Sequence, residues 1–405
     1  HQFSFLKANN PSLTDDVILA IDDSTISGRV PANVAVNDLI ANFEVTANSV
    51  TINTAMQSSG VSRNDFTQIV TYTVMNSDGV SVDFDVDVTH FTGLPIIYLS
   101  TDNAVPIDSK DDYVTGQVQV DGGREFANLT SSQMKIRGRG NSTWGIHPKK
   151  PYQMKLEEKA TFLDMLEDKK WLFLAEYSDK TLLRNTIAFE MGHRSRLDWT
   201  PQSEFAEVYL NGQYNGTYNI TQKVEEGNER VDLADVGFLL EIDQLHRLDP
   251  DDVYFYTNHF LINVKEPSIE AEDANYILIR DRILAFETAL FSDDFKDETL
   301  GYRPHIDLAS FIDWYLISEI TKNVDSKDFS SIYLNAMPEG PIKMGPLWDF
   351  DLSFGNVDYA DSRYAQGFWI KDHPWYQRLF ADPSFVSEVN ARFTDFKNDQ
   401  ALILA

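Results

Sequence analysis

The sequence predicts an α+β protein, with an all-β module first and a larger region of mixed α and β structure behind it. Short apolar or alternating runs recur up to Val88, and the pattern changes to mixed helix and strand from Pro95 onward. A chain of 405 residues is also longer than one hydrophobic core usually supports. We therefore expect two domains, covering residues 1–92 and 93–405.

The first domain has the pattern of a small β-sandwich. Strand-like runs include Ile69–Val74 and Val80–Val88, and Asn76–Gly79 between them supplies a hairpin turn. Strands at this spacing are typical of an immunoglobulin-like sandwich. No cluster of chemically reactive side chains accompanies them, so we expect a spacer or adhesive module.

The second domain mixes helices and strands. Ile96–Ser100 is a continuous apolar run, which is typical of a buried strand. Two stretches, 271–291 and 308–322, carry apolar residues at helical spacing and predict long amphipathic helices.

Composition excludes several classes of function. The net charge of −29, from 63 acidic and 34 basic residues, repels a phosphate backbone, so we expect no nucleic-acid partner. Cysteine is absent, which excludes disulfides, thiol catalysis and cysteine-based zinc sites and fits a secreted or cell-surface bacterial protein. We see no signal peptide at His1 and no run near the roughly 18 apolar residues needed to span a bilayer.

A glycine-containing segment between two predicted strands is the first candidate for chemistry. Ile136–Trp144 combines two glycines, small hydroxyl residues and two arginines, and Lys149–Leu156 follows it. Close backbone approach, free N–H groups and arginines suit an anion such as a polyphosphate, although the glycines alone also fit a tight structural loop. The candidate anion contacts are Arg137, Gly138, Arg139, Gly140, Asn141, Ser142 and Lys150.

A lysine and a glutamate form the second candidate. Lys155 lies on the strand after the loop, on the face opposite Tyr152 and Met154. Ser178-Asp179 is expected to open a helix that places Glu190 on its inward face. A buried carboxylate needs a cation, so Glu190 is expected to pair either with Lys155 or with an arginine of its own helix.

Three aspartates form the third and strongest candidate. Asp325 follows a helix, and a predicted hairpin then leads to Asp349 and Asp351. Because a hairpin brings the start of its first strand beside the end of its second, the three carboxylates should lie close together. A divalent cation would relieve their repulsion.

At these residues the sequence resembles the CotH family of atypical protein kinases. The resemblance covers most of the domain that begins near Pro95 and rests on seven ordered runs. They are Arg137-Gly-Arg-Gly-Asn-Ser-Thr-Trp144, Lys149-Lys-Pro-Tyr152, Asp168-Lys-Lys-Trp171, Tyr177-Ser-Asp-Lys180, Leu182-Leu-Arg-Asn185, Val208-Tyr-Leu-Asn-Gly212 and Gly345-Pro-Leu-Trp-Asp-Phe-Asp351.

The resemblance implies a two-lobed kinase-like fold that uses ATP with Mg²⁺, or Mn²⁺, to phosphorylate Ser or Thr of an exported or surface protein. Lys155 would contact phosphates and Glu190 would orient it. Asp325 would be the catalytic aspartate, and Asp349 with Asp351 would bind metal. Ordinary kinases carry an Asn five residues after the catalytic Asp, where this chain has Ser330.

Two other functions fit parts of the pattern. A surface adhesin or scaffold could keep the fold without catalysis, and the N-terminal module would suit it. A metal-dependent hydrolase could use the same carboxylates with water as acceptor. Neither requires Lys155, Glu190, Asp325 and Asp349 together, so the kinase interpretation is the one that we carry forward.

Overall fold

The computed structural model describes residues 2–13, 15–31, 34–123, 125–271 and 273–403. Contacts divide the chain into two compact units, His1–Leu94 and Pro95–Ala405. None of the described helices is both long enough and apolar enough to cross a membrane.

The first unit is a β-sandwich. Its sheets have the strand orders β2-β1-β6, β3-β4-β11-β10-β7-β8 and β5-β9. Phe3 and Phe5 of β1 share one core with Tyr72 of β10 and Val86 of β11, so side chains from two sheets fill the interior. The predicted hairpin is confirmed, because Met75 pairs with Ser81 across the turn.

The strands of this unit are β1 (Gln2–Phe5), β2 (Val17–Ile18), β3 (Ala20–Asp22), β4 (Thr25–Pro31), β5 (Leu39–Ile40), β6 (Asn42–Glu44), β7 (Ser49–Ile52), β8 (Ala55–Met56), β9 (Arg63–Asn64), β10 (Val70–Met75) and β11 (Ser81–Phe91).

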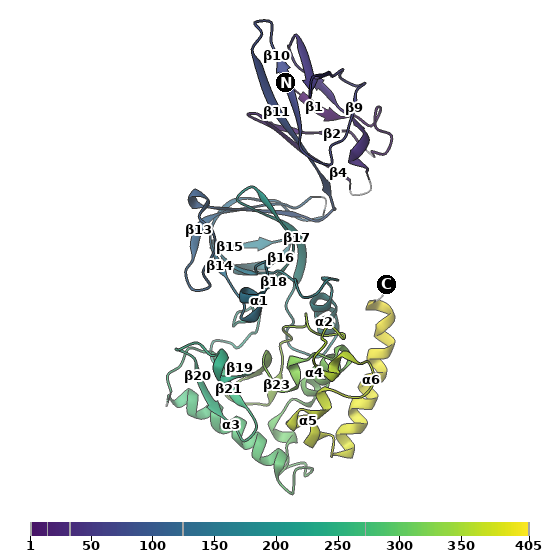
Figure 1. Ribbon diagram of the computed structural model, residues 1–405. Coiled ribbons are helices and arrows are strands. Elements are labelled where there is room, and N and C mark those ends of the chain that lie inside the picture. Colours follow the sequence, from purple (N-terminus) through teal and green to yellow (C-terminus); the bar gives the residue numbers. More distant parts are fainter. Residues whose placement is uncertain (1, 14, 32–33, 124, 272, 404–405) are drawn as a thin grey trace. The chain divides into compact units, whose positions relative to one another are not determined.

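The second unit begins with a closed barrel in the order β12-β13-β14-β15-β16-β18-β17 (Figure 1). The barrel closes because β12 pairs in parallel with β17, with Ile97 opposite Val208. Alternate residues such as Met154 and Trp171 point inward and fill it. The barrel strands are β12 (Ile96–Thr101), β13 (Val114–Asp121), β14 (Leu129–Gly138), β15 (Tyr152–Phe162), β16 (Met165–Leu174), β17 (Ser203–Leu210) and β18 (Gln213–Gln222).

A five-stranded sheet follows, in the order β20-β21-β19-β22-β23. Its strands are β19 (Phe238–Asp243), β20 (Val253–Tyr256), β21 (Leu261–Glu266), β22 (Ile332–Ala336) and β23 (Ile342–Met344). Leu240 and Leu334 pair across β19 and β22 and join the core formed with the helices. Glu241 and Tyr333 also pair, and the alternation of side chains puts them on the opposite face. One face is therefore apolar and helix-covered, and the other, which we call the polar face, carries Glu241 beside core residues such as Tyr333.

Helices cover the apolar face, as Figure 1 shows for α3 beside β19 to β21. The two long helices predicted from sequence are present, although α3 begins at Ala274 and α4 ends at Thr321. Asp307 caps α4 by accepting the Ser310 N–H at 2.7 Å. The helices are α1 (Ser142–Ile146), α2 (Arg184–His193), α3 (Ala274–Phe291), α4 (Leu308–Thr321), α5 (Pro374–Leu379) and α6 (Pro383–Ile403).

One helix begins later than the sequence predicted. Ser178-Asp179 was expected to open it, but α2 starts at Arg184. Leu183 is the N-cap residue, and the buried carboxylate of Asp179 still accepts the first N–H of the helix, that of Arg184, at 2.9 Å. Leu182 adopts φ = 62°, and this left-handed residue places an irregular segment between the cap and the helix.

His373 is a buried histidine in the helix-side core. Its Nδ1 accepts the Trp375 N–H at 3.2 Å, and its ring lies 4.7 Å from that of Phe260. Burial lowers the pKa of His373 to about 3, and a neighbouring histidine, His259, acts in the same direction. The folded protein therefore holds His373 neutral, whereas the unfolded chain protonates it near its ordinary pKa of 6.5.

We expect His373→Asn to reduce the loss of stability of the second unit in mild acid. His373 destabilises the fold only below pH 6.5, where the unfolded state alone binds the proton. Between pH 7.5 and pH 5.0 this costs about 2 kcal/mol, and the variant, which keeps an acceptor for Trp375, should not show it. Urea unfolding followed by tryptophan fluorescence measures this unit, since all 7 tryptophans lie after Pro95. An unchanged pH dependence in the variant would contradict the prediction.

Candidate active site

The structure brings the three predicted aspartates together at one end of the β22–β23 hairpin. Asp325 begins a short turn after α4, and Asp349 and Asp351 follow β23. Burial raises the pKa of Asp325 to about 6, and the charge of Asp349 acts in the same direction. Burial followed by the Asp349 charge raises the pKa of Asp351 well above its usual range. These mutual effects show that the three carboxylates share one electrostatic environment.

Neutral side chains hold the backbone of this acidic cluster. Asn323 donates from Nδ2 to the Asp349 carbonyl at 3.1 Å, and its Oδ1 accepts the Asp325 N–H at 3.2 Å. Ser331 Oγ donates to Asp349 Oδ2 at 3.4 Å. Asp349 itself adopts φ = 65°, a left-handed conformation that is unusual for a residue other than glycine. The surrounding structure therefore fixes the direction of this carboxylate.

The carboxylates of this cluster fit a divalent cation whose remaining coordination positions are filled by water or phosphate oxygens. None of Asp325, Asp349 and Asp351 forms an ion pair with a lysine or arginine within the described residues. No group of three or more His, Cys, Asp or Glu side chains in the described ranges could hold a metal ion by itself. Mg²⁺ commonly takes only one or two carboxylates and completes its shell with water and phosphate oxygens. Asp349 and Asp351 fit that pattern.

Arg139 faces the same cluster from the glycine-containing segment. Its guanidinium lies 5.6 Å from the centre of the Trp348 ring, and Asp349 and Glu176 both act electrostatically on it. Burial lowers the pKa of Arg139, against the effect of these carboxylates. No carboxylate among the described residues lies within ion-pair distance of it. A half-buried guanidinium without an ion-pair partner is suited to bind an anion.

Close packing explains both glycines of that segment. A Cβ on Gly138 would lie 2.4 Å from the ring of Trp144. Gly140 adopts φ = 86°, which side chains disfavour. Asn141 and Ser142 are exposed.

Two predicted anion contacts are instead engaged with the protein. The Arg137 guanidinium donates to the Lys110 carbonyl and lies 5.1 Å from the Tyr113 ring centre. Lys150 Nζ donates to the Trp144 carbonyl at 2.5 Å. Their polar atoms therefore stabilise the loop, and an anion would compete with these contacts.

Lys155 lies in a row of three lysines on the outside of the barrel. It pairs directly with Lys135 on β14 and Lys170 on β16. Leu172 shares the outward face of β16 and belongs to the helix-side core, so this face is turned toward the helices. Like charges directly across strands destabilise a sheet. Glu225 already offsets part of that repulsion, because its carboxylate accepts from Lys170 Nζ at 2.6 Å.

Glu190 does not pair with Lys155, which corrects one of the two alternatives. Its carboxylate accepts from Arg194 Nε at 2.6 Å, one turn along α2. The Glu190 side chain is 40% exposed, so it does not face the interior. The expectation took Leu183 to mark the inward face, but Leu183 is exposed, and the buried face of α2 includes Ala188 and Phe189 instead.

The sequence predicted a buried glutamate and assigned it to Glu190. The structure has Glu176 as a buried carboxylate instead, and the sequence did not identify it. Glu176 is 6% exposed and accepts from Asn185 Nδ2 at 3.0 and 3.1 Å and from Asn219 Nδ2 at 3.3 Å. Burial raises the pKa of Glu176 to about 7. It directly precedes the Tyr177–Lys180 run, which is the only sequence signal for it.

A second missed carboxylate lies on the polar face of the sheet. Glu241 is 6% exposed and accepts the Ser331 N–H at 3.2 Å. Burial raises the pKa of Glu241 to about 7. Lys265 lies 3.8 Å away, so this carboxylate has a cation that the three site aspartates lack.

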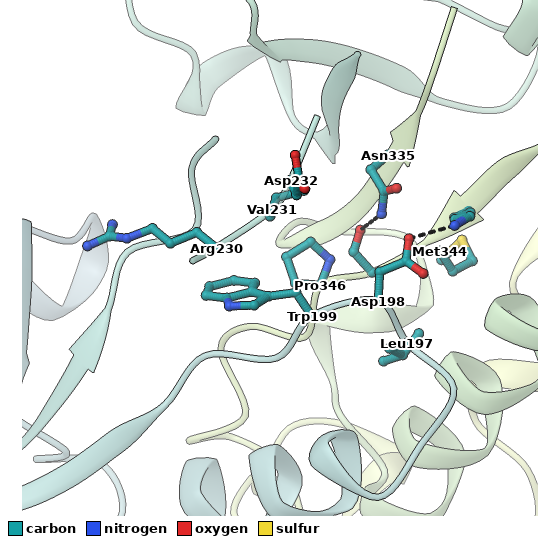
Figure 2. Close-up of a pocket in the computed structure, with 11 residues that line it drawn as sticks. Leu197, Asp198, Trp199, Arg230, Val231, Asp232, Asn335, Met344 and Pro346 are labelled. Atoms are coloured by element: carbon teal, nitrogen blue, oxygen red, sulfur yellow. Dashed lines mark hydrogen bonds and ion pairs between the residues drawn. The ribbon is translucent and has the colours of Figure 1, made fainter. Parts of the chain in front are cut away.

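Two cavities adjoin the hairpin and the site. The first, of about 190 Å³, lies beside Trp199 and Pro346, where Lys343 contacts Asp198 at 2.7 Å and Asn335 donates to the Gly345 carbonyl (Figure 2). The second, of about 310 Å³, is lined by Asp328 and the turn between β20 and β21. Only the second reaches the usual size of small-molecule pockets, about 300–1,000 Å³. Asp328 is exposed and lines it, directly after the turn that begins at Asp325.

The second unit matches a known protein family over most of its length. Residues 136–401 match the family model described as CotH kinase protein, over more than half of the chain. The chain belongs to the CotH kinase family. The match spans the glycine-containing segment, α2 and the acidic cluster. Residues 9–88 match the model described as SGBP, N-terminal, and this region is the all-β first unit of the CotH chain.

Comparison with individual proteins adds no functional information. A search of curated proteins returns no match. A solved structure from Bacteroides fragilis, described as a secreted protein, is 21% identical and covers 22% of this chain and 89% of its own, with a TM-score of 0.16. One from Bacteroides thetaiotaomicron, described as a glycoside hydrolase, is 13% identical and covers 66% and 82%, with a TM-score of 0.18. Scores this low support no argument about fold or function.

We expect Glu190→Ala to lower the free energy of unfolding by no more than about 0.5 kcal/mol, the usual contribution of an exposed i,i+4 ion pair. Arg194→Ala is the matched control and should have a similar effect, because it removes the same pair. Breaking a buried lysine–glutamate pair would instead cost about 3–5 kcal/mol. Urea unfolding of both variants decides between the two, and a loss of that larger size for Glu190→Ala alone would restore the pairing with Lys155.

Proposed function

We propose that the CotH domain is an ATP-dependent protein kinase with a two-lobed, kinase-like arrangement, in which the barrel and the helix-covered sheet bind the nucleotide between them. The observation that carries this proposal is Arg139, a half-buried guanidinium without an ion-pair partner among the described residues, whose electrostatic partner Asp349 also lacks one. A metal–triphosphate complex has phosphate oxygens that can pair with Arg139 and a metal ion that can bind the aspartates. The acceptor is a Ser or Thr hydroxyl of an exported or surface protein.

The cations of the barrel bind the phosphates. Arg139 interacts electrostatically with Asp349, and Lys155 lies on the outward face that is turned toward the helices. Asp349 and Asp351 hold Mg²⁺ or Mn²⁺. When bound, the cation neutralises charge that develops on the transferred phosphoryl group.

Asp325 orients the acceptor and takes its proton. As the acceptor oxygen forms a bond to the γ-phosphorus, the bond from that phosphorus to the β,γ-bridging oxygen breaks and ADP leaves. The hydroxyl proton passes to the Asp325 carboxylate. A general base positioned in this way typically contributes about 10²–10⁴-fold to a rate.

An acceptor chain can reach this carboxylate from the side of the larger cavity. Asp328, which lines that cavity, lies three residues after Asp325 in the same turn, and Gln244 holds the turn by donating to the Asp328 carbonyl at 3.1 Å. The absence of cysteine fits an exported bacterial protein that folds without disulfides. The N-terminal unit would then present the kinase at a surface.

Transfer of labelled phosphate from γ-labelled ATP, with Mg²⁺ or Mn²⁺, tests the proposal. We expect incorporation into the protein itself or into a generic acidic or basic substrate. Asp325→Asn should lower the rate by about 10²–10⁴-fold, because the proton acceptor is lost. Asp349→Asn should abolish the metal-dependent rate.

Asp361→Asn is the matched control, since Asp361 is an exposed aspartate outside the site and should retain full activity. Release of inorganic phosphate without transfer would favour a metal-dependent hydrolase. Failure of the wild-type protein either to bind nucleotide or to transfer phosphate would overturn the proposal and leave the adhesin or scaffold function.

A further inference from the structure

One short segment contacts both halves of the proposed site. Residues 175–185, which we call the bridging segment, connect β16 to α2. On one side the segment meets the glycine-containing loop. Lys149 Nζ donates to the Ala175 carbonyl at 2.8 Å, and Ser178 Oγ lies 3.1 Å from His147 Nε2. The loop that carries the anion-binding arginine is thus tied to this segment.

On its other side the bridging segment holds the element that contains Asp349 and Asp351. Arg184 Nε donates to the Ser353 carbonyl at 3.0 Å. Asn356 Nδ2 donates both to the Ser178 carbonyl at 3.1 Å and to the Asp351 carbonyl at 2.8 Å. These contacts therefore fix the backbone just after the two aspartates. They join residues that lie about 170 positions apart in the sequence.

Asn185 contacts the backbone between the two aspartates, whereas Ser178 of the same segment forms a hydrogen bond with the Asp351 carboxyl group itself. Asn185 Oδ1 accepts the N–H of Phe350, the residue between the two aspartates, at 2.7 Å. Its Nδ2 donates to both oxygens of Glu176 at 3.0 and 3.1 Å. All three groups are buried, with Asn185 3% and Phe350 1% exposed. The two partners fix the orientation of the carboxamide, since the N–H requires an oxygen and the carboxylate requires the NH₂ group.

We propose that Asn185 is a positioning residue that couples the bridging segment to the metal-binding aspartates, with Glu176 as the group that orients it. This inference rests on the metal-binding part of the proposed function. Glu176 adopts φ = 47°, and its carboxylate is buried. A left-handed backbone and a buried carboxylate both cost free energy, so we infer that the Glu176 carboxylate has a function beyond local packing. Its role is to hold the Asn185 carboxamide so that the Phe350 N–H, and with it both aspartates, stays in one place.

Mn²⁺ affinity, measured by titration calorimetry without nucleotide, tests the inference. We expect Asn185→Leu to weaken Mn²⁺ binding by about 10–100-fold, the usual effect of removing a partner that orients a metal ligand. Asn219→Leu is the matched control. Asn219 also donates to Glu176 and is also buried, but no contact joins it to Phe350, and binding should change by less than about threefold.

A charge-conserving exchange separates positioning from simple electrostatics. Asn185→Asp keeps an oxygen for the Phe350 N–H but sets two buried carboxylates against each other, so we expect weaker Mn²⁺ binding although a negative charge is added. Asn185→Asp combined with Glu176→Gln restores a carboxamide–carboxylate pair with its polarity reversed. The double variant should return to within about threefold of the wild-type affinity.

Hydrogen–deuterium exchange of the peptide that contains Phe350 provides a second readout. Exchange should rise in Asn185→Leu and remain at the wild-type level in the double variant. Tighter Mn²⁺ binding by Asn185→Asp, an equal loss in Asn219→Leu, or a wild-type protein that binds no Mn²⁺ would each overturn the inference. A protein that shows the expected pattern but transfers no phosphate would retain the inference and lose the proposed kinase activity.

Discussion

The site depends on gathering several carboxylates in a partly buried place without neutralising them. A lysine or arginine beside Asp349 or Asp351 would stabilise the fold and would also occupy the charge that a metal ion has to meet. The chain instead uses neutral carboxamides. Asn323 holds the backbone of Asp325 and Asp349 from the α4 side, and Asn185 holds the residue between Asp349 and Asp351 from the α2 side. Hydrogen bonds to backbone groups supply position without supplying charge.

The parts of the fold that follow from local rules could be predicted from the sequence. The hairpin at Asn76–Gly79 needs only a turn sequence between alternating strands, and α4 needs only an apolar stripe and a cap. The meeting of Asp325 with Asp349 follows from the geometry of the β22–β23 hairpin, because pairing of adjacent strands is short in range and fixed in direction. The barrel could not be predicted in this way, since its closure is a parallel pairing between β12 and β17, which lie more than one hundred residues apart.

The prediction that Glu190 pairs with Lys155 was wrong because it also depends on tertiary packing. Helical spacing gives the relative directions of side chains along a helix, but the first residue of the helix and its packing decide which face is inward. Tertiary packing buries the face of α2 that contains Ala188 and Phe189, and Glu190 lies outside that face. The buried carboxylate is Glu176, and it lies in an irregular segment with a left-handed backbone, where no periodic pattern exists to reveal it. Its partners Asn185 and Asn219 come from a helix and a strand, so only the tertiary structure identifies them.

The closure of the barrel also defines what can fold by itself. The family match begins at Ile136, inside β14, whereas β12 and β13 lie wholly before that position. A fragment cut at Ile136 would lack β12, β13 and most of β14, and would leave largely unpaired edges on β15 and β17. Such edges recruit other chains, which makes the shortened protein prone to aggregate. We therefore expect the smallest independently folding form of the second unit to start at Pro95. The segment that matches the family is shorter than the segment needed to close the barrel.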